Sequence, residues 1–107
     1  GSSVTKFKKG DRVVSDTTAY QQKIAKYGGW QKYVVCAEDK TDKIPAGIPF
    51  EDAAAIPFAL LTAVAALTLK LGMERPGSHQ NGRVLIWSAS GSVGGYAVQY
   101  ASSVSNI

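Results

Sequence analysis

A run of small residues near the end of the chain has the residue types and spacing that bind a dinucleotide phosphate. It reads SASGSVG over residues 88–94, follows the apolar run 84–87, which predicts a strand, and precedes a predicted helix over 92–104. In this order, small residues let backbone N–H groups approach a pyrophosphate, and the helix N-terminus adds the positive end of its dipole. Ala89 occupies the first glycine position, so the pattern is A-x-G-x-x-G, and its place between strand and helix gives it weight.

We therefore predict that backbone N–H groups of this turn bind the cofactor. The alternative is that the small residues only let the helix pack closely on its strand. On the helix, an apolar stripe at helical spacing predicts one packed face. The candidate cofactor-binding residues are Ser90, Gly91, Ser92, Val93 and Gly94, and the stripe consists of Val93, Ala97, Ala101 and Val104.

The charge pattern after this turn predicts that the chain is a segment of a larger protein. A complete unit continues to a second strand, whose charged residue meets the ribose about 20 residues after the glycine turn. The sequence ends at Ile107, and residues 84–107 contain no charged residue. A free-standing domain normally carries charges on the outer face of its last helix.

The first half of the chain is expected to be built from turns and strands. Residues 8–14 predict a tight turn that enters a strand, with Gly10 and Asp11 as turn residues, and residues 31–37 predict a second strand rich in Tyr and Val. A loop is expected over residues 40–43. Two prolines and a glycine over 44–49 predict the best internal boundary.

Helices are expected to follow this boundary. A short helix over 50–56 should be broken by Pro57, which lacks an N–H, and a longer helix over 58–71 should stop at Gly72. Apolar residues surround most of the longer helix, which predicts burial on several sides. The apolar stretch 53–69 contains a proline and is flanked by charges, so we expect a buried helix rather than a membrane span.

Composition narrows the classes of function. The net charge of the 107 residues is +4, and residues 1–43 contain nine Lys or Arg and five acids. The lysines are scattered, which argues against a nucleic-acid partner. The single cysteine, Cys36, excludes an intrachain disulfide and a Cys-rich zinc site, and we expect it, like Trp30 and Trp87, to be buried. No secretory signal is visible, so a cytoplasmic location is expected.

Five segments in order resemble the medium-chain dehydrogenase/reductase superfamily, on its zinc-free side, where quinone oxidoreductase-like proteins and fungal trans-acting enoyl reductases belong. Each motif alone is common, but the ordered set covers nearly the whole chain. The segments are FKKGDRV over 7–13, YGGWQKYV over 27–34, Ile44-Pro45 with FEDAA over 50–54, Leu61-Thr62-Ala63, and the turn over 88–94.

The resemblance implies an α/β chain: a partial GroES-like catalytic barrel segment over 1–45, then the first helices and first β-α unit of a Rossmann-type domain over 46–107. It implies NADPH as cofactor, with NADH as the alternative, and a small-molecule substrate with an activated C=C or C=O. Thr62 resembles the threonine near the nicotinamide, with an ordinary helix threonine as the alternative. The zinc-binding members have a cysteine ligand where this chain has Phe58, so no metal site is expected. Relatives usually have glycine where this chain has Ser88 and Ser92.

No catalytic residue is assigned. Tyr20 and Tyr27 are candidate proton donors but are typical of packing residues, and His79 is expected to be exposed in a polar loop. The rival function is a non-catalytic module that self-associates, as a homodimer or a domain-swapped oligomer, through an exposed strand edge and its uncharged last helix.

Overall fold

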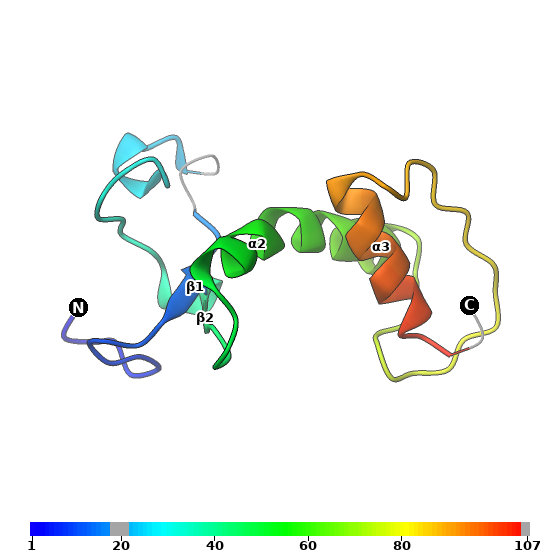
Figure 1. The fold of residues 1–107 in the computed structure, drawn as a ribbon, viewed down its shortest axis with the longest axis horizontal. Helices are drawn as coiled ribbons and strands as arrows, with labels where there is room; N and C mark the ends of the chain where they lie inside the picture. Colours follow the sequence, from blue (N-terminus) through cyan, green and yellow to red (C-terminus); the bar gives the residue numbers. More distant parts are fainter. Residues whose placement is uncertain (18–21, 106–107) are drawn as a thin grey trace. The chain divides into compact units, whose positions relative to one another are not determined.

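The structure, a computed structural model, describes residues 1–17 and 22–105 and divides the chain into two compact units (Figure 1). These units are Gly1–Pro57 and Phe58–Ile107. The first contains a small sheet and the second is helical, so the α/β class is confirmed at this level. The division into a GroES-like segment and a Rossmann-type segment stays a prediction.

The sheet of the first unit consists of two short antiparallel strands. Strand β1 spans Val13–Ser15 and strand β2 spans Thr41–Lys43, with Val14 paired to Asp42. Strand β1 follows the predicted turn, but the expected loop over 40–43 is wrong because these residues pair with β1. The strand expected over 31–37 is also wrong, since no strand of the described residues pairs with it.

Polar contacts fix the rest of the first unit. Its two short 3-10 helices are η1 (Ala25–Tyr27) and η2 (Glu38–Lys40). The Glu38 carboxylate accepts the backbone N–H groups of Thr5, at 2.8 Å, and of Lys6. The Lys6 ammonium in turn lies 3.0 Å from the Asp42 carboxylate. These contacts join the N-terminal segment to η2 and to strand β2, which lie 32 or more residues later in the sequence.

The turn before strand β1 forms as predicted. Gly10 has a φ of +96°, in the region that favours glycine. The Asp11 carboxylate accepts the N–H of Lys8 at 3.0 Å and lies 2.9 Å from the Lys43 ammonium. The hydrogen bond from Lys8, followed by the contact with Lys43, lowers the pKa of Asp11.

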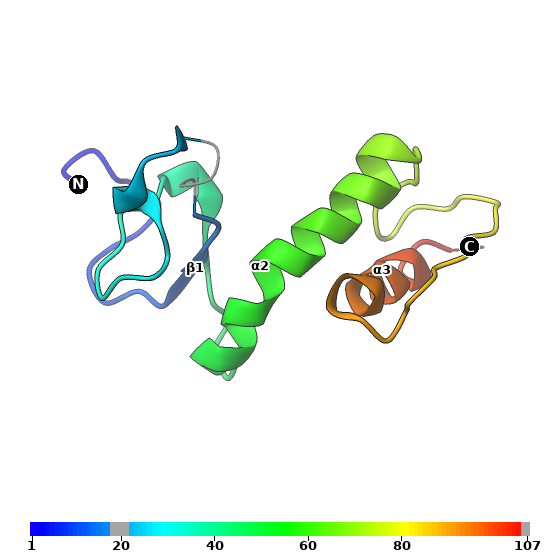
Figure 2. The same cartoon turned by 90° about the horizontal axis from the view of Figure 1, so that it is seen from above.

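The helix after the boundary runs through Pro57 without a break. Helix α2 spans Phe50–Val64 and continues into a π-helical turn, η3 (Ala65–Lys70), before Gly72 with a φ of +72° (Figure 2). The predicted break at Pro57 is therefore wrong, while the predicted stop at Gly72 is confirmed. A proline removes one backbone N–H, and the flanking Ala and Leu residues are strong helix formers that keep the remaining hydrogen bonds.

The burial expected on several sides of this helix is wrong. In its second half only Ala59, Ala63 and Leu67 are buried, at i, i+4 and i+8, whereas Phe58 is 79% exposed. By length and composition alone, residues 50–70 would suffice to cross a membrane, a test that core helices of soluble proteins also pass. The expected burial of Cys36, Trp30 and Trp87 is likewise wrong, because all three are exposed.

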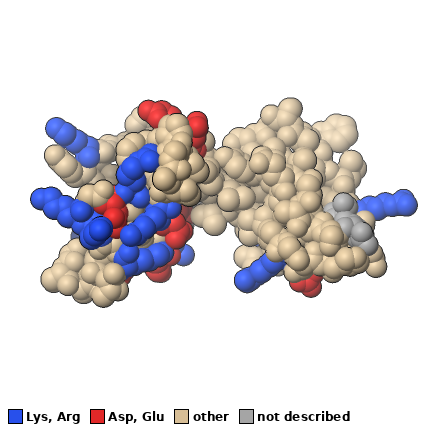
Figure 3. Space-filling view, turned by 60° about the horizontal axis from the view of Figure 1, so that its bottom comes forward, with Lys and Arg blue, Asp and Glu red and all other residues tan. Residues whose placement is uncertain are grey.

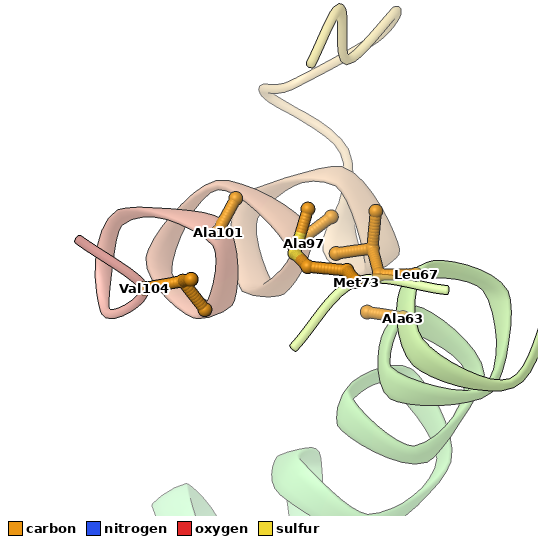
Figure 4. Close-up of a cluster of buried hydrophobic side chains, with 6 residues drawn as sticks. All are labelled: Ala63, Leu67, Met73, Ala97, Ala101 and Val104. Atoms are coloured by element: carbon orange, nitrogen blue, oxygen red, sulfur yellow. The ribbon is translucent and has the colours of Figure 1, made fainter. Parts of the chain in front are cut away.

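The core of the second unit lies between the end of helix α2 and helix α3, which spans Ser92–Ser102 (Figure 4). The predicted stripe of α3 is confirmed, since Ala97, Ala101 and Val104 are buried and Val93 packs against them. The Thr68 and Tyr100 hydroxyls lie 2.9 Å apart beside this core. The buried members are Ala63, Leu67, Met73, Ala97, Ala101 and Val104.

The lowered pKa of Asp11 predicts a pH-dependent stability. A carboxyl whose pKa is lower in the folded state stabilises that state above its unfolded pKa, and the contribution disappears as the pH falls through the folded value. We expect Asp11→Asn to lower the unfolding temperature at pH 7, and the difference from wild type to shrink below about pH 4. Thermal unfolding followed by circular dichroism at pH 2–7 measures this.

Asp39→Asn is the matched control, because the Asp39 side chain has no hydrogen bond or ion pair within the described part of the chain. Parallel pH profiles for wild type and Asp11→Asn would contradict the assignment.

Candidate functional site

The small residues predicted to bind a cofactor form a tight turn that leads directly into helix α3. The N–H of Gly91 donates to the carbonyl of Ser88 at 3.0 Å and closes the turn. Gly91 is the residue before the helix, with extended φ and ψ of −76° and 167°, and its carbonyl accepts the N–H of Gly95 at 2.8 Å. The helix therefore starts at Ser92, as the sequence predicts.

Gly94 lets the first turn of helix α3 lie against the backbone of this turn. A Cβ at Gly94 would overlap the Ser88 carbonyl oxygen and lie 2.9 Å from the Cα of Ala89. A Cβ at Gly91 would lie 3.3 Å from the same oxygen, whereas one at Gly95 would make an ordinary contact of 3.7 Å with the Ala89 carbonyl oxygen. The geometry thus supports the close-packing role that the sequence left as the alternative.

Ser88 has a φ of +59°, in the left-handed region where residues other than glycine are uncommon. The sequence prediction of a turn at this place did not include a left-handed conformation at Ser88. The signal that could have found it was the glycine that relatives usually have at this position, since only glycine takes such a φ without steric cost.

The start of helix α3 offers backbone donors to an anion. No side chain caps this end, and no acidic residue lies in the first turn. The first N–H groups of a helix have no partner within it, so those of Ser92, Val93 and Gly94 are available there. Ser90, Gly91 and Ser92 are exposed. On the face that Figure 3 shows, basic side chains gather on residues of the first unit, while the second unit is largely uncharged.

The strand predicted before the turn is not formed. Residues 84–87 pair with no strand of the described chain, and a β-strand requires a neighbour to satisfy its backbone groups. Ile86 packs against the core of the second unit, while Leu85 and Trp87 are each 89% exposed. The alternation of inward and outward side chains that a strand needs is therefore present without the pairing.

Thr62 lies on helix α2, separate in sequence from the glycine turn. Its hydroxyl donates to the Phe58 carbonyl at 2.7 Å and its side chain is exposed. This is the ordinary helix contact that the sequence left open, and no hydrogen bond joins Thr62 to residues 90–94. Phe58 itself is exposed, and the described residues contain no group of three or more His, Cys, Asp or Glu side chains that could hold a metal ion.

The candidate proton donors remain separate from the turn in sequence. Tyr20 lies outside the described residues, and Tyr27 is half-buried in the first unit with the Lys26 ammonium 4.9 Å from its ring centre. His79 is exposed, as predicted, and forms a parallel bridge with Ser105.

Comparison with known proteins gives relatives along nearly the whole chain. The dehydrogenase pigH of Monascus ruber is 39% identical over 109 residues, and the chloroplast envelope quinone oxidoreductase homolog of Arabidopsis thaliana is 40% identical over 101 residues. The trans-enoyl reductase himH of Aspergillus japonicus is 34% identical over 104 residues. These alignments cover 94% of this chain and 29–30% of each relative, so the chain spans about 30% of their length. No family model and no solved structure matches.

Two neighbouring glycines of helix α3 are expected to respond oppositely to the same substitution. Gly94→Ala places a methyl group against backbone that cannot turn away, and we expect a loss of about 1–3 kcal/mol in unfolding free energy. Gly95→Ala has room for its methyl group and gains roughly 0.5–1 kcal/mol from the higher helix propensity of alanine. Urea unfolding measured by circular dichroism compares both variants with wild type. Equal stability of the two variants would contradict the close contact at Gly94.

Proposed function

The chain belongs to the quinone oxidoreductase-like and trans-enoyl reductase branch of the medium-chain dehydrogenase/reductase superfamily, and from this we propose that it is a segment of an NAD(P)H-dependent, zinc-independent oxidoreductase. The proposed substrate is a small molecule with a polarised C=C or C=O, such as an enone, a quinone or an enoyl thioester. The names of the relatives, quinone oxidoreductase homolog and trans-enoyl reductase, support this class.

The observation that carries the proposal is the uncapped start of helix α3 behind a turn without bulky side chains. The donors of Ser92, Val93 and Gly94 meet the needs of a pyrophosphate, which binds where backbone N–H groups and the helix dipole converge. The glycine at 94 keeps the turn close to these donors, and the exposed Ser90 and Gly91 leave the approach open. The residues present therefore fit a dinucleotide.

In this proposal the chain binds and orients, and the bound nicotinamide supplies the hydride. The backbone N–H groups of residues 92–94 hold the pyrophosphate, and Ser90 and Gly91 line its approach. The Thr62 hydroxyl donates its proton to the Phe58 carbonyl. It can therefore bind a ligand only as an acceptor, or as a donor after the hydroxyl group rotates. Zinc independence rests on Phe58, an apolar side chain where the zinc-binding members have a cysteine. NADPH is proposed before NADH by resemblance alone.

The location of the protein in the cell and its assembly into oligomers are also proposals. We propose a cytoplasmic protein, while relatives from spinach and Triphysaria versicolor are chloroplastic by name. No proton donor is proposed.

A negative charge introduced at the start of helix α3 tests cofactor binding separately from folding. Ser92→Asp places a carboxylate where the helix dipole favours it, so we expect unfolding free energy to stay level or to rise by about 0.3–1 kcal/mol. The same carboxylate repels a pyrophosphate, so we expect NADPH affinity to fall at least about tenfold, measured by nicotinamide fluorescence.

The matched control is Gln99→Glu, which adds the same charge about 10 Å further along the helix, roughly one Debye length away. Failure of the wild-type chain to bind NADPH at millimolar concentration, or equal binding by Ser92→Asp, would overturn the proposed site.

A second candidate function is a non-catalytic module that self-associates. The observation that favours it is the unpaired segment 84–87 with Leu85 and Trp87 exposed. An extended segment with unpaired backbone groups is a template for pairing with another chain.

Native mass spectrometry distinguishes the two candidates. Self-association predicts multiples of the 11.3 kDa chain mass, and we expect Trp87→Ser to shift them toward the monomer because it removes exposed apolar area from the pairing segment. Trp30→Ser is the matched control, since Trp30 is also exposed but lies in the first unit. A monomer at micromolar concentration would exclude the second candidate.

A further inference from the structure

The second unit contains a pocket that is separate from the glycine turn. Its volume is about 330 Å³, at the lower end of the range of small-molecule sites. No residue from 88 to 94 lines it. The lining residues that matter here are the apolar Leu71, Met73, Val84 and Leu85 and the polar Gln80 and Arg83.

The apolar part of the pocket combines a buried floor with exposed walls. Met73 is 5% exposed and belongs to the core of the second unit, so the floor is fixed by packing. Leu71 and Leu85 are 74% and 89% exposed and face water over most of their surface. Covering them with an alkyl chain would remove apolar area from water, which favours binding by about 0.8 kcal/mol for each buried CH₂ group.

The polar part of the pocket supplies a cation without a counter-charge. Within the described part of the chain, ion pairs join Lys6 to Asp42 and Lys43 to Asp11, so the Arg83 guanidinium has no carboxylate partner. Arginine presents a planar fork of donors that matches a carboxylate and binds it through two hydrogen bonds.

The wall beside Arg83 is held in place by hydrogen bonds. The Gln80 side chain accepts the N–H of Glu74 at 2.9 Å, and its own amide N–H group donates to the Gly72 carbonyl at 3.4 Å. The Gln80 backbone N–H donates to the Ser105 carbonyl at 3.1 Å, which joins this loop to the end of helix α3. A pocket whose walls are fixed before binding loses less entropy when a ligand enters.

We propose that this pocket binds an amphipathic carboxylate, a short alkyl chain that ends in a carboxylate group. The carboxylate pairs with Arg83, and the alkyl chain lies over Met73, Leu71 and Leu85. The site does not depend on the oxidoreductase function proposed above, because it uses none of the residues assigned to the cofactor.

Isothermal titration of the full chain with octanoate tests the site. Acetate lacks the alkyl chain and octanol lacks the carboxylate, so both are expected to bind at least fivefold more weakly than octanoate. Arg83→Gln is expected to weaken octanoate binding about tenfold and to leave octanol binding unchanged, because only the carboxylate loses its partner. Arg75→Gln is the matched control, since Arg75 is exposed in the same loop but does not line the pocket.

A second variant tests the apolar wall. Leu85→Ser removes apolar area from an exposed side chain and is expected to weaken octanoate severalfold without loss of the circular dichroism spectrum. Absence of octanoate binding, equal weakening by Arg83→Gln and Arg75→Gln, or octanol binding as tight as octanoate would each overturn the proposal. Competition between octanoate and NADPH would also overturn it, since the ligand would then occupy the glycine turn. Failure of NADPH to bind at all would leave this test unchanged.

Discussion

The contact between Gly94 and the Ser88 carbonyl is the constraint on which the second unit depends. The absence of a side chain at Gly94 lets helix α3 begin against the backbone of the preceding turn. That start sets the rotation of the helix, so Ala97 and Ala101 fall on the buried side at one and nearly two turns beyond. The same start leaves the first N–H groups of the helix without a side-chain cap and without a partner inside the helix. One steric condition thus positions both the core and the candidate phosphate site.

Local signals predicted most of this arrangement. The turn at Gly10, the start of helix α3 at Ser92, the stripe on this helix and the stop at Gly72 depend on a few adjacent residues, and the structure confirms them. Cofactor binding by residues 90–94 stays a prediction. Apart from strand β1, which follows the predicted turn, the strand predictions were wrong because pairing depends on a distant partner. Strand β2 formed where a loop was expected, because Asp42 and its neighbours lie beside β1. Residues 84–87 are unpaired. Their sequence pattern specifies the alternation of inward and outward side chains, but it cannot provide a neighbouring strand.

Burial was the least predictable property for a related reason. Apolar side chains on all sides of helix α2 allow the helix to be buried on every side. They do not specify how many other elements pack against it. In the second half of the helix Ala59, Ala63 and Leu67 are buried, while Phe58 and Leu69 are exposed to water. The chain spans about 30% of the length of the relatives that it matches. The sequence of a helix gives the apolar character of each face, and it does not give the neighbours that cover that face.

Ser88 shows why a departure from the usual glycine can keep the site. A non-glycine residue with a φ of +59° costs roughly 1–2 kcal/mol. The Ser88 carbonyl accepts the N–H of Gly91, so this conformation also directs the oxygen that excludes a side chain at Gly94. A serine in another conformation would turn this oxygen elsewhere and release the start of helix α3. The strain at Ser88 and the donors at Ser92 and Val93 are therefore two consequences of the same turn. A substitution at position 88 that relieves the strained conformation and moves this carbonyl would therefore also displace the N–H donors of Ser92 and Val93.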